Sequence, residues 1–158
     1  MTVVMSEHAT GRSLVSEGLF DRLARRVVAE EGVDRAMAER IVDQALAFVA
    51  VCGSNSAMPL SPSAAVDIGW HAFILHTKEY ADFCDRVAGR FVHHVPTAEE
   101  DRGTRGEAAR ATLVRTVEAV GRRYVIDAQL WPLTDIGCQK CTGCHNGCHD
   151  DPPPPPGA

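Results

Sequence analysis

A group of side chains that bind soft metal ions lies close to the carboxyl end of the chain. The run CQKCTGCHNGCHD spaces four cysteines as C-x2-C-x2-C-x3-C and adds two histidines. Thiolate and imidazole are preferred ligands of zinc and similar ions, and the small turn-forming residues between them let such a run wrap an ion without a folded core. The sequence therefore predicts a metal site in this tail, with the candidate ligands Cys138, Cys141, Cys144, His145, Cys148 and His149.

Zinc is the predicted ion of the tail, and an iron–sulfur cluster is the alternative. The cysteine spacing coincides with the bacterial ferredoxin run, but a histidine and not a proline follows the fourth cysteine, and the chain contains no second run. Typical zinc sites use two C-x2-C pairs that are set further apart. A polar, thiol-bearing tail that binds no specific ion is the third interpretation.

A second, weaker candidate metal site lies between Leu60 and Pro96. Asp67 and His71 are four residues apart, so on a helix the carboxylate can orient the imidazole and leave its other nitrogen for a metal or a proton. His93 and His94 follow in a segment that we expect to be extended, where alternate side chains point to opposite sides. At most one of these two histidines should therefore face His71. The competing interpretation is a structural Asp–His hydrogen bond inside the core.

Five segments have apolar residues at a 3.6-residue period, and serine, threonine, proline and glycine residues mark their ends. Ser61 and Thr77 are the predicted N-caps of the third and fourth helices. We predict an all-α fold, with one compact domain over residues 13–135 and a Cys/His- and Pro-rich tail over residues 136–158 that is disordered without metal. The predicted helices span about 16–32, 34–53, 61–75, 77–89 and 106–121.

Composition limits the classes of partner and the compartment. The formal charge of -5 argues against a nucleic-acid surface, because duplex binding depends on clustered lysine and arginine. No apolar run approaches the ~20 residues that cross a bilayer, and the start MTVVMSEHATGR lacks the basic and apolar blocks of a secretory signal. We predict a cytoplasmic protein with no nucleic-acid or membrane partner, whose six cysteines stay reduced, and leave a protein partner open.

The segment from Ser61 to Pro96 resembles the conserved block of the glycine-rich domain-containing protein-like family. Members share a VD-x-x-WH core, which here reads VDIGWH from Val66 to His71, and the bacterial branch continues much as this chain does through the His-His doublet to Pro96. The resemblance implies a small, mainly helical domain with, in many relatives, a tail rich in Gly or Cys. It implies no reaction.

The leading functional hypothesis is a non-enzymatic helical module with a metal-binding tail, acting as an adaptor or a metal handler. The first alternative is a metal-dependent enzyme that uses Asp67, His71 and one or both of His93 and His94. The second alternative is a structural protein-interaction domain. No serine stands in a nucleophile elbow and no glycine-rich phosphate loop follows a strand, so the sequence indicates no catalytic residue.

Overall fold

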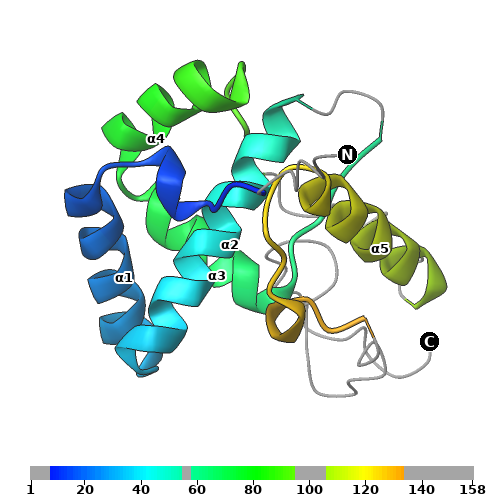
Figure 1. Ribbon diagram of the computed structural model, residues 1–158, viewed down its shortest axis with the longest axis horizontal. Helices are drawn as coiled ribbons and strands as arrows, with labels where there is room; N and C mark the ends of the chain where they lie inside the picture. Colours follow the sequence, from blue (N-terminus) through cyan, green and yellow to red (C-terminus); the bar gives the residue numbers. More distant parts are fainter. Residues whose placement is uncertain (1–7, 55–57, 95–105, 134–158) are drawn as a thin grey trace, which may run out of the picture.

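The computed structural model describes residues 8–54, 58–94 and 106–133, and Figure 1 shows how they are arranged. Helices dominate these residues and no strand occurs among them, so the predicted all-α fold is confirmed. An isolated bridge joins Ala9 and Tyr124. The predicted tail, with its boundary near residue 136, lies outside the described residues. Among the described helices, none is both long and apolar enough to span a bilayer.

Five α-helices and three short helical turns make up the described fold. A 3-10 turn precedes α1, a π-helical turn extends α4, and a second 3-10 turn follows α5. In chain order the elements are η1 (Arg12–Leu14), α1 (Glu17–Glu31), α2 (Arg35–Ser54), α3 (Ala64–Ile74), α4 (Thr77–Phe83), η2 (Cys84–Ala88), α5 (Glu107–Gly121) and η4 (Ala128–Leu130).

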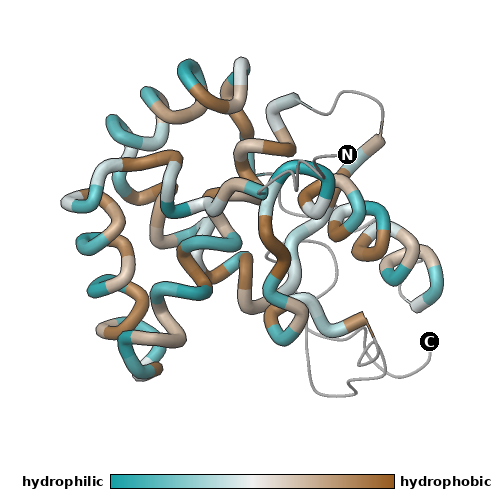
Figure 2. The backbone as a smooth tube through the Cα atoms, in the orientation of Figure 1, coloured by the Kyte–Doolittle hydropathy of each residue, from teal (hydrophilic) through white to brown (hydrophobic). Residues whose placement is uncertain are grey.

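Helix α2 is the centre of the fold. It contacts α1, α3, η2 and α5, and Figure 1 places α1 and α5 on opposite sides of it. Its second half, from Gln44 to Val51, is buried at every position, as expected of a helix that is covered all round. Figure 2 shows the hydrophilic residues of α1 and α4 on their outer turns, away from α2.

A buried glutamine fastens the last described segment to α2. The amide nitrogen of Gln44 donates to the carbonyl of Val125 at 2.9 Å. Its oxygen accepts from the backbone N–H of Asp127 at 3.1 Å and from Nε1 of Trp131 at 2.8 Å. Trp131 thereby covers the end of the helical core with its indole nitrogen satisfied, as a buried tryptophan requires.

The start of α3 differs from the prediction. Ser63, and not Ser61, caps the helix, because its hydroxyl accepts the hydrogen bond from the N–H of Val66 at 3.2 Å. The backbone N–H of Ser61 donates instead to Oγ1 of Thr116 in α5 at 3.0 Å. This tertiary bond holds the chain outside the helix through Pro62, so α3 begins later than the Ser-Pro pair suggested.

The break between α3 and α4 lies where the sequence indicated, but two details differ. Thr77 is the first residue of α4 and His76 occupies the cap position, without a side-chain cap bond. A π-helical turn, Cys84–Ala88, continues α4, and the sequence did not predict it. Gly89 then ends this turn in the left-handed conformation with φ of 81°, which glycine adopts without strain.

Candidate metal centre

Helix α3 supplies two of the candidate ligands from neighbouring turns of one face. Asp67 lies in the first turn, where the helix dipole favours a carboxylate. His71 follows one turn later, and its Nε2 lies 3.4 Å from Oδ2 of Asp67. The pairing predicted from the four-residue spacing is therefore present. Because Ser63 sets the first turn of α3, it also fixes the position of Asp67, whose N–H donates to the carbonyl of Ser63 at 2.9 Å.

The third side chain comes from the segment after Gly89. Nε2 of His94 lies 3.2 Å from Oδ1 of Asp67 and 3.2 Å from Nε2 of His71. Exposure alternates along this segment: Val92 is buried, His93 is exposed and His94 is largely covered. The structure thus brings one member of the doublet to His71, as an extended segment requires.

His93, which the sequence placed among the candidate ligands, points to the other side. Its ring packs against the exposed ring of Phe91, with 4.7 Å between the centroids. Within the described residues, the donor atoms that lie within 4.8 Å of one another come from Asp67, His71 and His94. The candidate centre therefore has one carboxylate and two imidazoles.

The separations of these donor atoms match the spacing of ligands around a tetrahedral ion. Two nitrogens bonded to zinc at about 2.05 Å and at the tetrahedral angle lie ~3.3 Å apart. The two imidazole nitrogens are 3.2 Å apart, and they lie 3.2 and 3.4 Å from the two different oxygens of Asp67. The nitrogens thus have the spacing of two zinc ligands, and the carboxylate lies beside both of them.

The protons of the two imidazoles argue for a cation as well. A neutral imidazole carries its one N–H on either of its two nitrogens. If both facing Nε2 atoms carry the proton, each can donate to its own oxygen of Asp67, but the two N–H groups then meet at 3.2 Å. If neither carries it, two lone pairs meet beside a carboxylate. If only one of the two Nε2 atoms carries a proton, that single N–H is the one donor for the three close contacts among Asp67, His71 and His94. A cation satisfies the carboxylate and both lone pairs together.

Aromatic side chains hold His94 in place. The ring of Trp70 lies against the ring of His94, with 4.4 Å between the centroids. Nε1 of Trp70 donates to the hydroxyl of Tyr80 at 2.9 Å. That hydroxyl donates to the carbonyl of Val92 at 2.6 Å. Burial raises the pKa of Tyr80 above its usual range, so the phenol stays protonated and can donate. No local sequence pattern connects the Tyr80 hydroxyl to Val92, so the sequence did not predict this bond.

The centre can be reached from solvent on one side. The His71 side chain is 50% exposed, whereas Asp67 and His94 are each 13% exposed. The largely covered pair restrains the positions of two donors, and the half-exposed imidazole leaves the third donor accessible to solvent. This combination is more typical of an exchangeable site than of a closed structural one.

The remaining sequence candidates lie elsewhere. All six ligands predicted in the tail are outside the described residues. The two other cysteines, Cys52 and Cys84, are free thiols that pack with the core and are not among the clustered donors. Burial raises the pKa of Cys52 to about 12, which keeps that thiol protonated and unreactive at neutral pH.

Comparison with known proteins identifies a family that matches most of the chain. A family model described as UCP032817-like covers residues 12–128, which include Asp67, His71 and His94, and the family is uncharacterised. The resemblance to the glycine-rich domain-containing protein-like family is not confirmed by this match. No curated protein and no solved structure matches the chain. The geometry of the centre is therefore the basis on which a function can be assigned.

Proposed function

This chain belongs to the UCP032817-like family, and we propose that its helical domain binds a divalent transition metal ion, zinc, through Asp67, His71 and His94. The observation that carries the proposal is the convergence of one carboxylate and two imidazole Nε2 atoms at 3.2 to 3.4 Å. Imidazole and carboxylate ligands suit zinc and also other divalent ions such as Fe²⁺.

Three protein donors favour an ion that exchanges or reacts over one that only stabilises the fold. Structural zinc sites are generally closed by four protein ligands, whereas catalytic sites provide three and leave a position for water or substrate. The half-exposed side chain of His71 supports the second class. Metal handling is the function we propose, and a metal-dependent reaction at the same ion is the second candidate.

We propose the tail as a separate metal-binding element. The support is the sequence alone: four cysteines and two histidines within a run that has almost no apolar residue to bury. Zinc is the proposed ion and an iron–sulfur cluster the alternative, which a visible absorption band in the freshly purified protein would reveal. A protein partner that receives the ion, or that the module joins as an adaptor, is part of this proposal.

The metal content of two proteins distinguishes binding at the centre from binding in the tail. The first is the full chain, and the second is the full chain with the tail cysteines changed to serine and the tail histidines to alanine. Both are purified without chelator, loaded with zinc, desalted and analysed for bound metal. We expect the tail variant to keep about one equivalent of zinc, the number that one mononuclear centre holds. A tail variant without stoichiometric metal would refute the centre and leave the tail as the metal-binding part.

His93 provides a matched control for His94. In the tail variant, His94→Ala removes a ligand and should release the ion, while His93→Ala removes a neighbouring imidazole that faces the other side and should retain it. Circular dichroism checks that both variants keep the helical fold. Equal metal content in the two variants would contradict the assignment of His94.

A further inference from the structure

We propose that Tyr80 is a positioning residue for the metal centre, although it does not contact the ion. Its hydroxyl fixes the backbone that carries His94 and the indole on which His94 lies. The inference rests on the proposed metal binding and adds to it the side chain that sets the affinity. Groups outside the coordination shell that orient a ligand usually change metal affinity by about 10- to 100-fold.

The hydroxyl of Tyr80 joins the two elements that supply the ligands. It accepts a hydrogen bond from Nε1 of Trp70, which stands next to His71 on α3, and it donates to the carbonyl of Val92, two residues before His94. Tyr80 itself is 2% exposed, so water does not compete freely for these bonds. One oxygen atom therefore sets the distance between α3 and the segment that carries His94.

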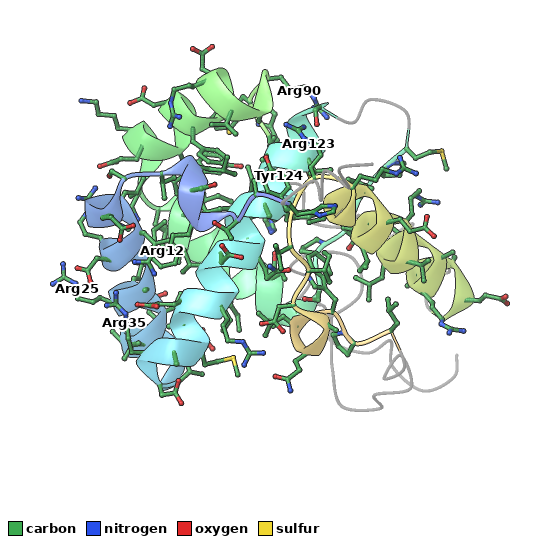
Figure 3. All side chains as sticks on the ribbon, in the orientation of Figure 1. Arg12, Arg25, Arg35, Arg90, Arg123 and Tyr124 are labelled. Carbon is green, nitrogen blue, oxygen red and sulfur yellow. The ribbon has the colours of Figure 1, made fainter. Side chains whose placement is uncertain are left out.

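Other contacts hold the same segment, among them the ring of Phe91 against the Tyr80 ring, with 5.4 Å between the centroids, which Tyr80→Phe would keep. The Arg90 guanidinium donates to the carbonyls of Cys52 and Gly53 at the end of α2, at 2.9 and 3.0 Å, and Figure 3 shows Arg90 at that end of the helix. The side chain of Val92 is buried. Arg90 anchors the backbone four residues before His94, and an apolar side chain gives no directional restraint. The bond from Tyr80 fixes the Val92 carbonyl, and with it the direction in which the chain reaches His94.

The Tyr80 hydroxyl also restrains the indole ring of Trp70. The indole ring is the surface against which the His94 imidazole packs, at 4.4 Å and a tilt of 52°. Because Nε1 of that ring donates to Tyr80, the hydroxyl restrains the indole as well as the backbone. Loss of the oxygen would loosen His94 from both sides while leaving Asp67 and His71 on their helix.

The test compares Tyr80→Phe with Tyr124→Phe in the full chain with the tail donors replaced. Tyr124 is also buried, at 4% exposure, and lies after α5 rather than beside the ligands. Co²⁺ is titrated into each protein, and both the dissociation constant and the visible spectrum of the bound ion are recorded. We expect Tyr80→Phe to weaken Co²⁺ binding by about 10- to 100-fold and to shift the spectrum. Tyr124→Phe should bind as the unsubstituted protein does.

The outcomes separate this inference from the proposed function. If the unsubstituted protein binds Co²⁺ and His94→Ala abolishes binding, but Tyr80→Phe and Tyr124→Phe give the same constant and spectrum, Tyr80 is not a positioning residue. If no protein in the series binds Co²⁺, the proposed function fails first. Should Tyr80→Phe melt below the assay temperature, Trp70→Phe replaces it, since it removes the other partner of the hydroxyl; unchanged affinity and spectrum there would also overturn the inference.

Discussion

Gly69 lies between the two α3 ligands, where that helix crosses α2, and its replacement by alanine should damage both the packing and the centre. A Cβ atom at this position would lie 2.7 Å from Cβ of Ala45 and 2.9 Å from the carbonyl oxygen of Ile41. Both distances are shorter than real Cβ contacts, and one of the obstructing atoms belongs to the backbone. The two helices would have to separate by roughly half an ångström, against a core that is packed like a crystal.

The magnitude follows from two opposing effects. Overpacking of this kind costs about 1–3 kcal/mol, whereas alanine in place of glycine inside a helix gains about 0.5–1 kcal/mol. Gly18 in α1 offers the control, because nothing lies within 4 Å of a Cβ built there. We expect Gly18→Ala to leave the free energy of unfolding unchanged or slightly raised. The free energy of unfolding of Gly69→Ala should be lower than that of Gly18→Ala by about 1–3 kcal/mol, which is the cost of overpacking.

Urea denaturation followed by circular dichroism measures this difference, with both variants in the same buffer. Gly18 lies in the first turn of α1 and Gly69 in the interior of α3, where the gain in helix propensity is fully present, so a deficit of Gly69→Ala against Gly18→Ala reports the contact between α2 and α3. Gly69→Ala should also weaken zinc binding, because a displaced α3 moves Asp67 and His71 relative to His94. Equal stability of the two variants would refute the argument from close helix approach.

Three further substitutions test the parts of the fold that surround the centre. Ser63→Ala removes the cap of α3 and should lower the free energy of unfolding by about 1 kcal/mol, measured by urea denaturation. Trp131→Phe leaves the buried side-chain oxygen of Gln44 with one hydrogen-bond donor fewer. It should lower the melting temperature by an amount that corresponds to about 1–3 kcal/mol of stability. Arg40→Gln tests a pH dependence, because the Arg40 guanidinium lowers the pKa of Asp127. The stability that this ion pair adds is present above the ordinary carboxyl pKa and is lost as the pH falls through the lowered pKa of Asp127. The stability difference between this variant and the unsubstituted protein should therefore be largest near neutral pH and shrink in acid, where the bond from Arg40 to Gln129 at 2.6 Å remains.

Most of the helices could be predicted because their signals are local. The apolar period and the terminal glycine at position 32 predicted α1. An aspartate, a residue type that commonly caps helices, precedes α2, and the carboxylate of Asp34 accepts from the N–H of Met37 at 2.7 Å. The start of α3 could not be predicted in the same way. Two serines flank Pro62, and the choice between them depends on a bond to Thr116, more than fifty residues away.

The candidate centre could also be predicted only in part. Asp67 and His71 meet because four residues separate them on one helix, and this can be read from the sequence. The choice of His94 over His93 depends on the direction in which the chain returns after Gly89. That direction is set by the π-helical turn and by the bond between Tyr80 and Val92, neither of which has a sequence signal.

The two proposed metal sites should consequently respond in opposite ways to unfolding. His94 is 23 residues from His71 and 27 from Asp67, so the three donors meet only when α3 and the returning segment are packed together. An ion that binds this arrangement and not the unfolded chain stabilises the fold, and is released when the fold is lost. The six tail donors lie within a short run from Cys138 to His149 and can surround an ion without help from the helices. Zinc that leaves the protein together with its helical signal belongs to the centre on α3, and zinc that remains bound in urea belongs to the tail.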